Sequence, residues 1–197
     1  RNPFINAGAL VVADVLLSHY DDPEAALLAF MRERSCNAEV GRDEEIWTSE
    51  RRSGYRNIAL ANFIRSFGNI DNEVDAVLDL YFFQCALRMN CVDLARSVRY
   101  LAGRGVCPGT GTRVTSVERS TRINAVMMTC GTYDAAGEFA FHVGLPAKSG
   151  VGGGIVAVVP NVLSLCVWSP PLDDKGNSLL GAYALHRFTR MTGLSVF

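Results

Sequence analysis

The stretch "LPAKSGVGGGIVAVVP", residues 145–160, places a lysine and a serine directly before a glycine-rich turn and a run of strand-forming residues. Two interpretations compete for the glycines. They allow a tight turn or bulge between strands, because glycine adopts positive φ without penalty. Alternatively, they leave backbone N–H groups open to a substrate, with Lys148 and Ser149 at the edge of a cleft. The glycine spacing fits neither G-x-x-x-x-G-K-[ST] nor G-x-G-x-x-G, so a phosphate loop is excluded.

Helical patterns dominate the chain ahead of this stretch. Asp22 and Pro23 have the spacing of an N-cap and first helical residue, Ser49 can cap a helix, and Thr115 and Glu118 have capping-box spacing. The predicted helices cover residues 8–20, 21–34, 49–69, 72–89, 91–103 and 119–131.

The pattern changes in the last third of the chain. Residues 138–144 alternate, which predicts a strand with Phe139, Phe141 and Val143 on one face. Residues 154–160 and 162–170 are β-branched and bounded by turn residues, and residues 178–193 predict a closing helix. We therefore expect a two-lobed α+β fold, in which a mainly helical region (1–130) precedes antiparallel strands and a C-terminal helix (131–197) within one structural unit.

Composition narrows the class of protein. Of the 197 residues, 49% are hydrophobic and 20% charged, which is ordinary for a globular domain. The net charge of -1 gives no general attraction to nucleic acid or to an anionic membrane. The longest apolar run is broken by Pro160 and Asn161, so we expect no membrane span.

The six cysteines and three histidines show no spacing typical of metal ligands. There is no C-x-x-C motif and no Cys/His pairing at zinc-ligand distance along the chain, so we expect no metal site. Cysteines in apolar settings such as "FFQCAL" predict buried thiols in a cytoplasmic protein.

Five polar residues have both structural and functional interpretations. Glu50 and Asn57 are seven apart on one predicted helix, and spacing alone favours an exposed polar stripe. Tyr81 lies in an apolar helix, where a phenol normally packs and makes one hydrogen bond. Tyr133 follows a helix-ending glycine and either enters a cleft or covers the core. Asn6 can cap a helix.

Several longer segments carry a family resemblance. Residues 2–10 (NPFINAGAL), 66–69 (SFGN), 81–87 (YFFQCAL), 129–160 and 169–178 (SPPLDDKGNS) together resemble the bacterial and mitochondrial glutaminase family. These are serine-dependent, β-lactamase-like amidohydrolases that convert L-glutamine to L-glutamate and ammonia. The similarity extends over nearly the whole chain.

The resemblance implies a set of substrate-binding residues: Asn6, Glu50, Asn57, Tyr81, Tyr133 and Val151. A carboxylate such as Glu50 can pair with the α-ammonium of glutamine, and the amides of Asn6 and Asn57 can bind its α-carboxylate. Tyr81 and Tyr133 are candidates for hydrogen bonding at the reacting centre, and either could relay a proton.

The same resemblance gives the glycine-rich turn a role. The backbone N–H of Val151 is expected in an oxyanion hole, with the neighbouring glycines keeping it accessible. Lys148, Ser149 and Gly150 occupy the place of the Lys-Thr/Ser-Gly strand of penicillin-recognising enzymes, where the lysine supplies positive potential. No metal or organic cofactor is expected.

One part of the family pattern is missing from these residues. Such enzymes attack with the serine of a Ser-x-x-Lys motif, but neither lysine of this chain, Lys148 or Lys175, follows a serine at that spacing. Lys148 and Ser149 are adjacent on an expected strand, so their side chains point to opposite faces. We therefore expect the motif and further strands to precede Arg1, and the 197 residues, about two-thirds of the family's length, to be inactive alone.

Two alternatives remain open. A β-lactamase or transpeptidase-like hydrolase also uses a Lys-Ser/Thr-Gly strand, and a catalytically silent glutamine-binding or scaffold domain could keep the fold. For the intact protein, the apolar helices and the resemblance favour a homo-oligomer, a dimer or a tetramer.

Overall fold

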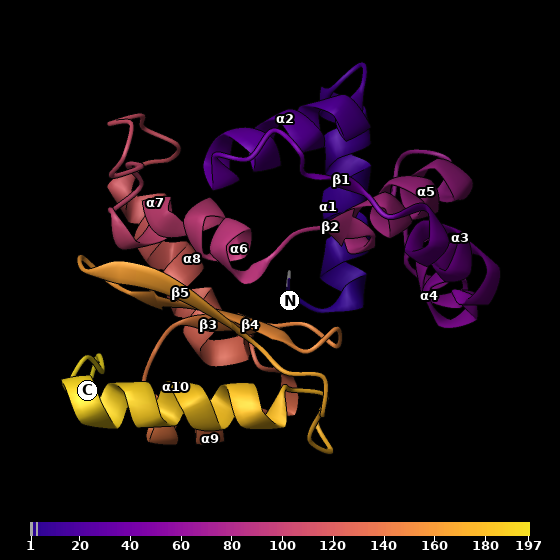
Figure 1. Cartoon of the computed structure of the whole chain (residues 1–197). Coiled ribbons are helices and arrows are strands. Elements are labelled where there is room, and N and C mark those ends of the chain that lie inside the picture. Colours follow the sequence, from indigo (N-terminus) through magenta and orange to yellow (C-terminus); the bar gives the residue numbers. More distant parts are fainter. Residues whose placement is uncertain (1, 3) are drawn as a thin grey trace. The chain divides into compact units, whose positions relative to one another are not determined.

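The computed structural model describes residue 2 and residues 4–197 of the chain (Figure 1). Arg1 lies outside the described residues, and so does Pro3, which belongs to the segment 2–10 quoted above. The chain divides into two compact units, one comprising residues 1–33 and 37–89 and the other residues 34–36 and 90–197. Both units draw on the region 1–130, and the division at residue 130 stays a prediction.

The first unit is almost entirely helical. Asp22 caps its second helix, where its carboxylate accepts the N–H of Ala25 at 2.9 Å, as the sequence predicts. The elements are α1 (Asn6–His19), α2 (Pro23–Ser35, whose last two residues belong to the second unit), β1 (Gly41–Arg42), α3 (Glu44–Ser53), α4 (Tyr55–Ser66), α5 (Val74–Cys85) and β2 (Leu87–Arg88).

Helix α5 is the centre of this unit. It packs against α1, α3 and α4, and Val77, Leu80 and Phe82 on it are almost fully buried. Fully burying a side chain of this size stabilises the fold by about 2 kcal/mol, so α5 organises the three helices around it.

A buried carboxylate joins α1 to the segment before α5. Asp14, only 5% exposed, accepts hydrogen bonds from the backbone N–H groups of Asp71 and Asn72 and from the Asn72 side-chain amide. These donors satisfy the charge that burial would otherwise penalise, so Asp14 fixes how the chain enters α5.

The long helix predicted for residues 49–69 is in fact two helices. Helix α3 ends at Ser53 and α4 begins at Tyr55, with Gly54 between them. A Cβ at Gly54 would lie 2.5 Å from the Phe82 ring and 2.6 Å from the carbonyl of Glu50, so only glycine fits this approach to α5. The predicted cap Ser49 lies inside α3, which Asp43 caps instead.

The second unit contains a three-stranded sheet and its covering helices. Ser116 caps α8 by accepting the N–H of Arg119, so the predicted capping box of Thr115 and Glu118 is wrong by one residue. The elements are α6 (Cys91–Ser97), α7 (Arg99–Ala102), α8 (Val117–Cys130), the 3₁₀ turn η1 (Tyr133–Ala135), α9 (Ala136–His142), β3 (Ala147–Ser149), β4 (Gly154–Val159), β5 (Leu163–Trp168) and α10 (Leu179–Thr192).

The sheet is antiparallel, in the order β3-β4-β5. Lys148 pairs with Val156, and Val156 pairs with Cys166. Ile155, Ala157 and Val159 of β4 pack with α9 and α10 in one apolar cluster. Figure 1 shows α10 running along one face of the sheet, while α6, α7 and α8 contact strands of the same sheet.

The strand predicted for residues 138–144 is instead helix α9. Phe139 and Val143 are four residues apart, which places both on one face of a helix, and both are buried. Phe141 is 84% exposed, whereas a strand would have placed it beside them. The apolar spacing was compatible with both periods, and packing against the sheet selects the helix.

No helix in the part of the chain that the structure describes combines the length and the apolar character needed to cross a bilayer.

Candidate functional site

In the second unit, Val151 lies in the turn between β3 and β4, outside the strand pairing. Within the turn, Gly150 donates its N–H to the carbonyl of Gly154, and Gly153 donates to that of Gly150. The backbone N–H of Val151 hydrogen-bonds instead to the side chain of Tyr133. A main-chain donor and a phenol therefore meet at an exposed turn.

Of the glycines in this turn, one is required by the tight turn itself and another leaves the backbone open, so each interpretation of the sequence applies to one of them. Gly153 has φ +92°, and a Cβ there would lie 2.5 Å from the carbonyl oxygen of Ser169, so it is required by the turn geometry. Around Gly152, by contrast, no atom lies within 4 Å of the position a Cβ would take. The turn is thus tightly built on one side and open on the other.

Tyr133 is held in an uncommon backbone conformation. Its φ of +54° lies in the left-handed region, which costs a non-glycine residue about 1 kcal/mol. Burial raises the pKa of its phenol, and the hydrogen bond from Val151 partly offsets that rise. Strained residues of this kind cluster at functional sites, because the surrounding structure must hold them in place.

Lys148 of β3 lies beside this phenol. Its Nζ is 4.8 Å from the centroid of the Tyr133 ring, within the range of a cation–π interaction, and it donates a hydrogen bond to the carbonyl of Ser149. Burial lowers the pKa of the Lys148 ammonium to about 8. A lysine with this pKa can hold or release a proton near neutral pH.

Ser149 points away from Lys148, as strand geometry predicts. It is 1% exposed, and its Oγ has no hydrogen-bond partner within the described residues. Ser149 therefore cannot form a dyad with its neighbour, and its backbone N–H bonds to the carbonyl of Gly131.

In the first unit, Asn6 and Asn57 are joined directly. The Nδ2 of Asn6 donates to the Oδ1 of Asn57 at 2.7 Å, across 51 residues of sequence. Asn6 does not cap α1, whose N-cap position is Ile5. This hydrogen bond leaves the Oδ1 and the second N–H of Asn6, together with both side-chain N–H groups of Asn57, as further hydrogen-bonding groups at one place.

The predicted stripe of Glu50 and Asn57 on one helix is wrong, because the two residues lie on α3 and α4, either side of Gly54. Glu50 instead lies near Cys85, at the C-terminal end of α5. Burial is the main cause that raises the pKa of the Cys85 thiol, and the negative charge of Glu50 adds to this rise.

Tyr81 hydrogen-bonds to the same thiol, so Glu50, Cys85 and Tyr81 share one neighbourhood. The apolar setting of Cys85 predicted a buried thiol, but the residue is exposed. The spacing of four residues between Tyr81 and Cys85, one helical turn, was the signal that linked them.

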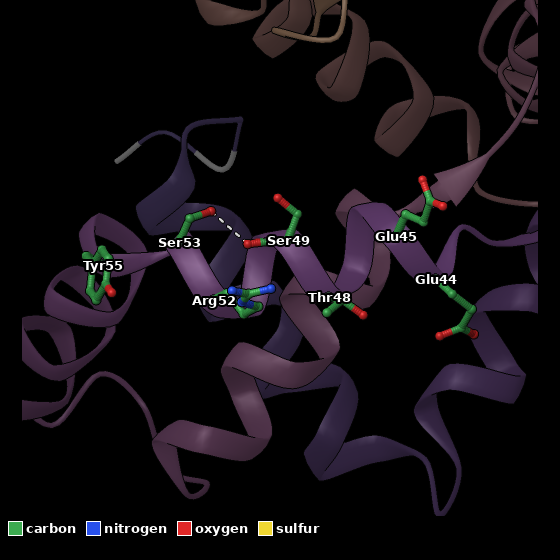
Figure 2. A pocket seen from close by; sticks show the side chains of 7 residues that line it. All are labelled: Glu44, Glu45, Thr48, Ser49, Arg52, Ser53 and Tyr55. Carbon is green, nitrogen blue, oxygen red and sulfur yellow. Dashed lines mark hydrogen bonds between the residues drawn. The ribbon is translucent and has the colours of Figure 1, made fainter.

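A hollow of about 740 Å³ also lies on the first unit (Figure 2). Figure 2 shows most of its lining side chains along α3 and that of Tyr55 at the start of α4. The hydroxyl of Ser53 donates to the carbonyl of Ser49 at 2.7 Å. The lining residues are Glu44, Glu45, Thr48, Ser49, Arg52, Ser53 and Tyr55, which include none of the predicted site residues.

The described residues contain no group of three or more His, Cys, Asp or Glu side chains that could hold a metal ion.

The fold and the Lys-Ser-Gly strand define a class: this is an α+β fold of the β-lactamase-like type, as predicted.

The crystal structure of the covalent complex between the Bacillus subtilis glutaminase YbgJ and 5-oxo-L-norleucine is similar, with a TM-score of 0.92 and 33% identity, over 98% of this chain and 69% of that one. The structure of Mglu in its glutamate form matches with a TM-score of 0.92 and 34% identity, over 98% of this chain and 44% of that one.

The chain belongs to the glutaminase family, whose pattern it matches over residues 1–197. It is 58% identical to the glutaminase of Streptomyces coelicolor and 55% identical to that of Methylobacterium radiotolerans, in both cases over its whole length. It spans 64% of the length of each of these relatives. The resemblance inferred from the sequence is thus confirmed, while the roles of individual site residues stay predictions.

Proposed function

We propose that the protein containing this chain hydrolyses the side-chain amide of L-glutamine to L-glutamate and ammonia, through an acyl-enzyme on a serine. The observation that carries the proposal is the meeting of the Val151 N–H with the Tyr133 phenol at the exposed turn of a Lys-Ser-Gly strand. The family membership and the names of the relatives support the choice of substrate.

The ligand in one similar structure supports this chemistry. The Bacillus subtilis glutaminase YbgJ forms a covalent complex with 5-oxo-L-norleucine by reaction with 6-diazo-5-oxo-L-norleucine. That ligand is an L-α-amino acid with a carbonyl at carbon 5, where glutamine carries its amide. A covalent bond to such a ligand is what a nucleophilic mechanism predicts.

In the second unit, the proposed roles concern the reacting carbonyl. The Val151 N–H would hold the oxyanion, exchanging its bond with Tyr133 for one to the tetrahedral intermediate. Tyr133 would then donate or relay a proton toward the leaving ammonia, and Lys148, with its lowered pKa, would set the local charge. An oxyanion donor of this type contributes about a hundredfold or more in rate.

In the first unit, the proposed roles concern recognition of the amino acid. Glu50 would pair with the α-ammonium group, and the Asn6–Asn57 pair would bind the α-carboxylate through its remaining N–H groups. Tyr81 is the second candidate proton carrier.

These 197 residues contain no Ser-x-x-Lys motif. We propose that such a motif elsewhere in the full-length protein supplies the nucleophile and that residues 1–197 alone do not hydrolyse glutamine. The homo-oligomeric state and cytoplasmic location expected from the sequence likewise stay proposals.

The test measures ammonia and glutamate release by the full-length protein with L-glutamine, in parallel with hydrolysis of the β-lactam nitrocefin. Steady turnover of glutamine with no cleavage of nitrocefin is the expected result. Nitrocefin cleavage without glutaminase activity would favour the β-lactamase alternative, and binding of glutamine with neither activity would favour a silent binding domain.

A further inference from the structure

Two cysteines of the second unit contact the same guanidinium group. Nη2 of Arg99, in α7, lies 3.8 Å from the Sγ of Cys36 and 4.0 Å from the Sγ of Cys107. Cys36 directly follows α2, and Cys107 lies in the loop between α7 and α8. The two sulfur atoms are therefore held within about 8 Å of each other, close enough for a local movement to bring them to the ~2 Å bond length of a disulfide.

Cys107 is surrounded by hydrogen-bond donors. Burial alone would raise the pKa of its thiol, but contacts with the Thr110 hydroxyl and the backbone N–H groups of Gly109 and Thr110, together with the charge of Arg99, lower it. These groups stabilise the thiolate, which is the reactive form of cysteine.

The two thiols differ in exposure in a way that suits a two-step reaction. Cys36 is exposed, whereas Cys107 is 2% exposed. The loop residues Gly109 and Thr110 that contact the Cys107 thiol are exposed themselves, so a small movement of this loop is enough to admit a molecule as small as hydrogen peroxide.

We propose that Cys36 and Cys107 form an oxidative modification site, in which a peroxide converts the two thiols beside Arg99 into a disulfide. The Cys107 thiolate attacks one peroxide oxygen, the O–O bond breaks, and hydroxide leaves to become water, which gives a sulfenic acid. The Cys36 sulfur then attacks the Cys107 sulfur, the S–O bond breaks, and a second water molecule leaves. Two thiols lose two hydrogens and one peroxide is reduced to two waters.

A second cysteine pair in the same unit offers an internal comparison. The thiols of Cys91 and Cys166 hydrogen-bond to each other, which places them in direct contact. Burial and the neighbouring Cys91 raise the pKa of Cys166 to about 12, so the Cys166 thiol stays protonated. If thiolate formation controls the reaction, the Cys36–Cys107 pair is oxidised first although its sulfur atoms are further apart.

The disulfide would join the end of α2 to the loop after α7, within the second unit. It would also close a covalent loop that includes the whole of residues 37–89, the larger segment of the first unit. Such a loop restricts the unfolded chain, so the oxidised protein should melt at a higher temperature than the reduced one.

The experiment treats the reduced full-length protein with an equimolar amount of hydrogen peroxide at pH 7.5, blocks remaining thiols with iodoacetamide, and maps tryptic peptides by mass spectrometry. Cleavage after arginine gives Ser35–Arg42 for Cys36 and Gly105–Arg113 for Cys107, so the product is one linked pair of short peptides. We expect that pair to form before any link between Cys91 and Cys166, and to disappear on reduction.

Variants separate the steps. In Cys36→Ser, the disulfide is lost and Cys107 should be trapped as a sulfenic acid by dimedone, whereas Cys91→Ser should leave the link unchanged. Arg99→Gln should slow oxidation of Cys107 several-fold, with Arg122→Gln on the surface of α8 as the matched control. Full alkylation of Cys107 after peroxide treatment, or earlier formation of the Cys91–Cys166 link, would overturn the proposal, as would an unchanged rate in a folded Arg99→Gln variant.

Discussion

The ammonium group of Lys148 lies 4.8 Å from the centre of the Tyr133 ring, at the start of the glycine-rich turn. The Tyr133 hydroxyl accepts a hydrogen bond from the Val151 N–H. The positive charge of Lys148 and the positive end of this N–H dipole therefore both face one phenol. The arrangement concentrates positive potential at an exposed turn whose other neighbours are glycines.

Replacing Lys148 with methionine should change how stability depends on pH. The folded pKa of Lys148, about 8, lies below its ordinary value of 10.5, so between these values the unfolded chain binds more protons and stability rises with pH. Below pH 8 both states are protonated and the cost of burying the charge is fully present. Lys148→Met should therefore be more stable at pH 7, by on the order of 2 kcal/mol, and lack this rise.

Urea unfolding at pH 7.0 and pH 9.5 measures both effects. Lys175→Met, at the only other lysine, is the control, because Lys175 is exposed and its pairing with Glu138 raises its pKa. An identical rise of stability between the two pH values in wild type and Lys148→Met would contradict the assignment.

Tyr133→Phe should reduce kcat/KM for glutamine by about a hundredfold in the full-length protein, because it removes the proton carrier and the partner of the Val151 N–H. Its melting temperature should change little, since the hydroxyl bonds to an exposed turn and not to the core. The control is Tyr183→Phe on α10, an exposed tyrosine outside the proposed site. Equal kinetics in the two variants would remove Tyr133 from the mechanism.

Glu50→Gln should lower kcat/KM for glutamine by ten- to a hundredfold while leaving the free energy of unfolding nearly unchanged. The reason is the loss of a charge-assisted hydrogen bond to the α-ammonium, which contributes about 1.5–3 kcal/mol. Glu45→Gln on the same helix is the matched control. Should Glu50→Gln destabilise the protein and leave its kinetics intact, Glu50 is a structural residue.

Gly153→Ala and Gly152→Ala should differ sharply, although the positions are adjacent. At Gly153 a Cβ meets the Ser169 carbonyl at 2.5 Å with φ +92°, so alanine should cost about 2 kcal/mol or more and displace the turn. At Gly152 the same methyl group meets nothing within 4 Å, so stability should stay within about 0.5 kcal/mol of wild type. Thermal unfolding of both variants checks this, and similar losses in both would argue against the turn geometry.

Asp14→Ala should destabilise the protein by about 3 kcal/mol, because it leaves the N–H groups of Asp71 and Asn72 without their acceptor. Burial opposes ionisation of Asp14, but the hydrogen bonds from Asn72 and Asp71 and the charge of Arg65 lower its pKa below the usual value. The stability it contributes is therefore complete above about pH 4 and is lost as pH falls through the lowered pKa.

Denaturant unfolding at pH 7 and in acid measures this contribution, with Asp21→Ala at an exposed site as the control. The two curves for wild type and Asp14→Ala should converge as the pH falls. Parallel curves over the whole acid range would mean that the carboxylate of Asp14 does not carry the effect.

The sequence predicted the parts of the fold in which local pattern and packing agree. Strands β4 and β5 are β-branched and bounded by turn residues, and α2 begins with an N-cap aspartate and a proline, so all three elements were found from the sequence. Residues 138–144 were misassigned because Phe139 and Val143 lie on one face under either period. The break at Gly54 was missed because it depends on the Phe82 ring of another helix, which no local pattern records.

The candidate site was only partly accessible to the same reasoning. The opposite directions of Lys148 and Ser149 follow from strand geometry alone, and the structure agrees. The Asn6–Asn57 hydrogen bond spans 51 residues, and the neighbourhood of Glu50, Cys85 and Tyr81 joins two helices. Such contacts arise from tertiary packing, which spacing along the chain does not record. For Glu50 and Asn57, the spacing therefore favoured an exposed stripe on one helix.

The close approach of Gly54 to Phe82 also constrains how this fold can change over evolutionary time. A methyl group at position 54 would overlap the ring and the carbonyl of Glu50, and a smaller residue at position 82 would relieve only the first overlap. In descendants of this sequence, Phe82 can therefore be substituted more freely than Gly54. The bend between the helices that carry Glu50 and Asn57 should persist even where Phe82 is replaced.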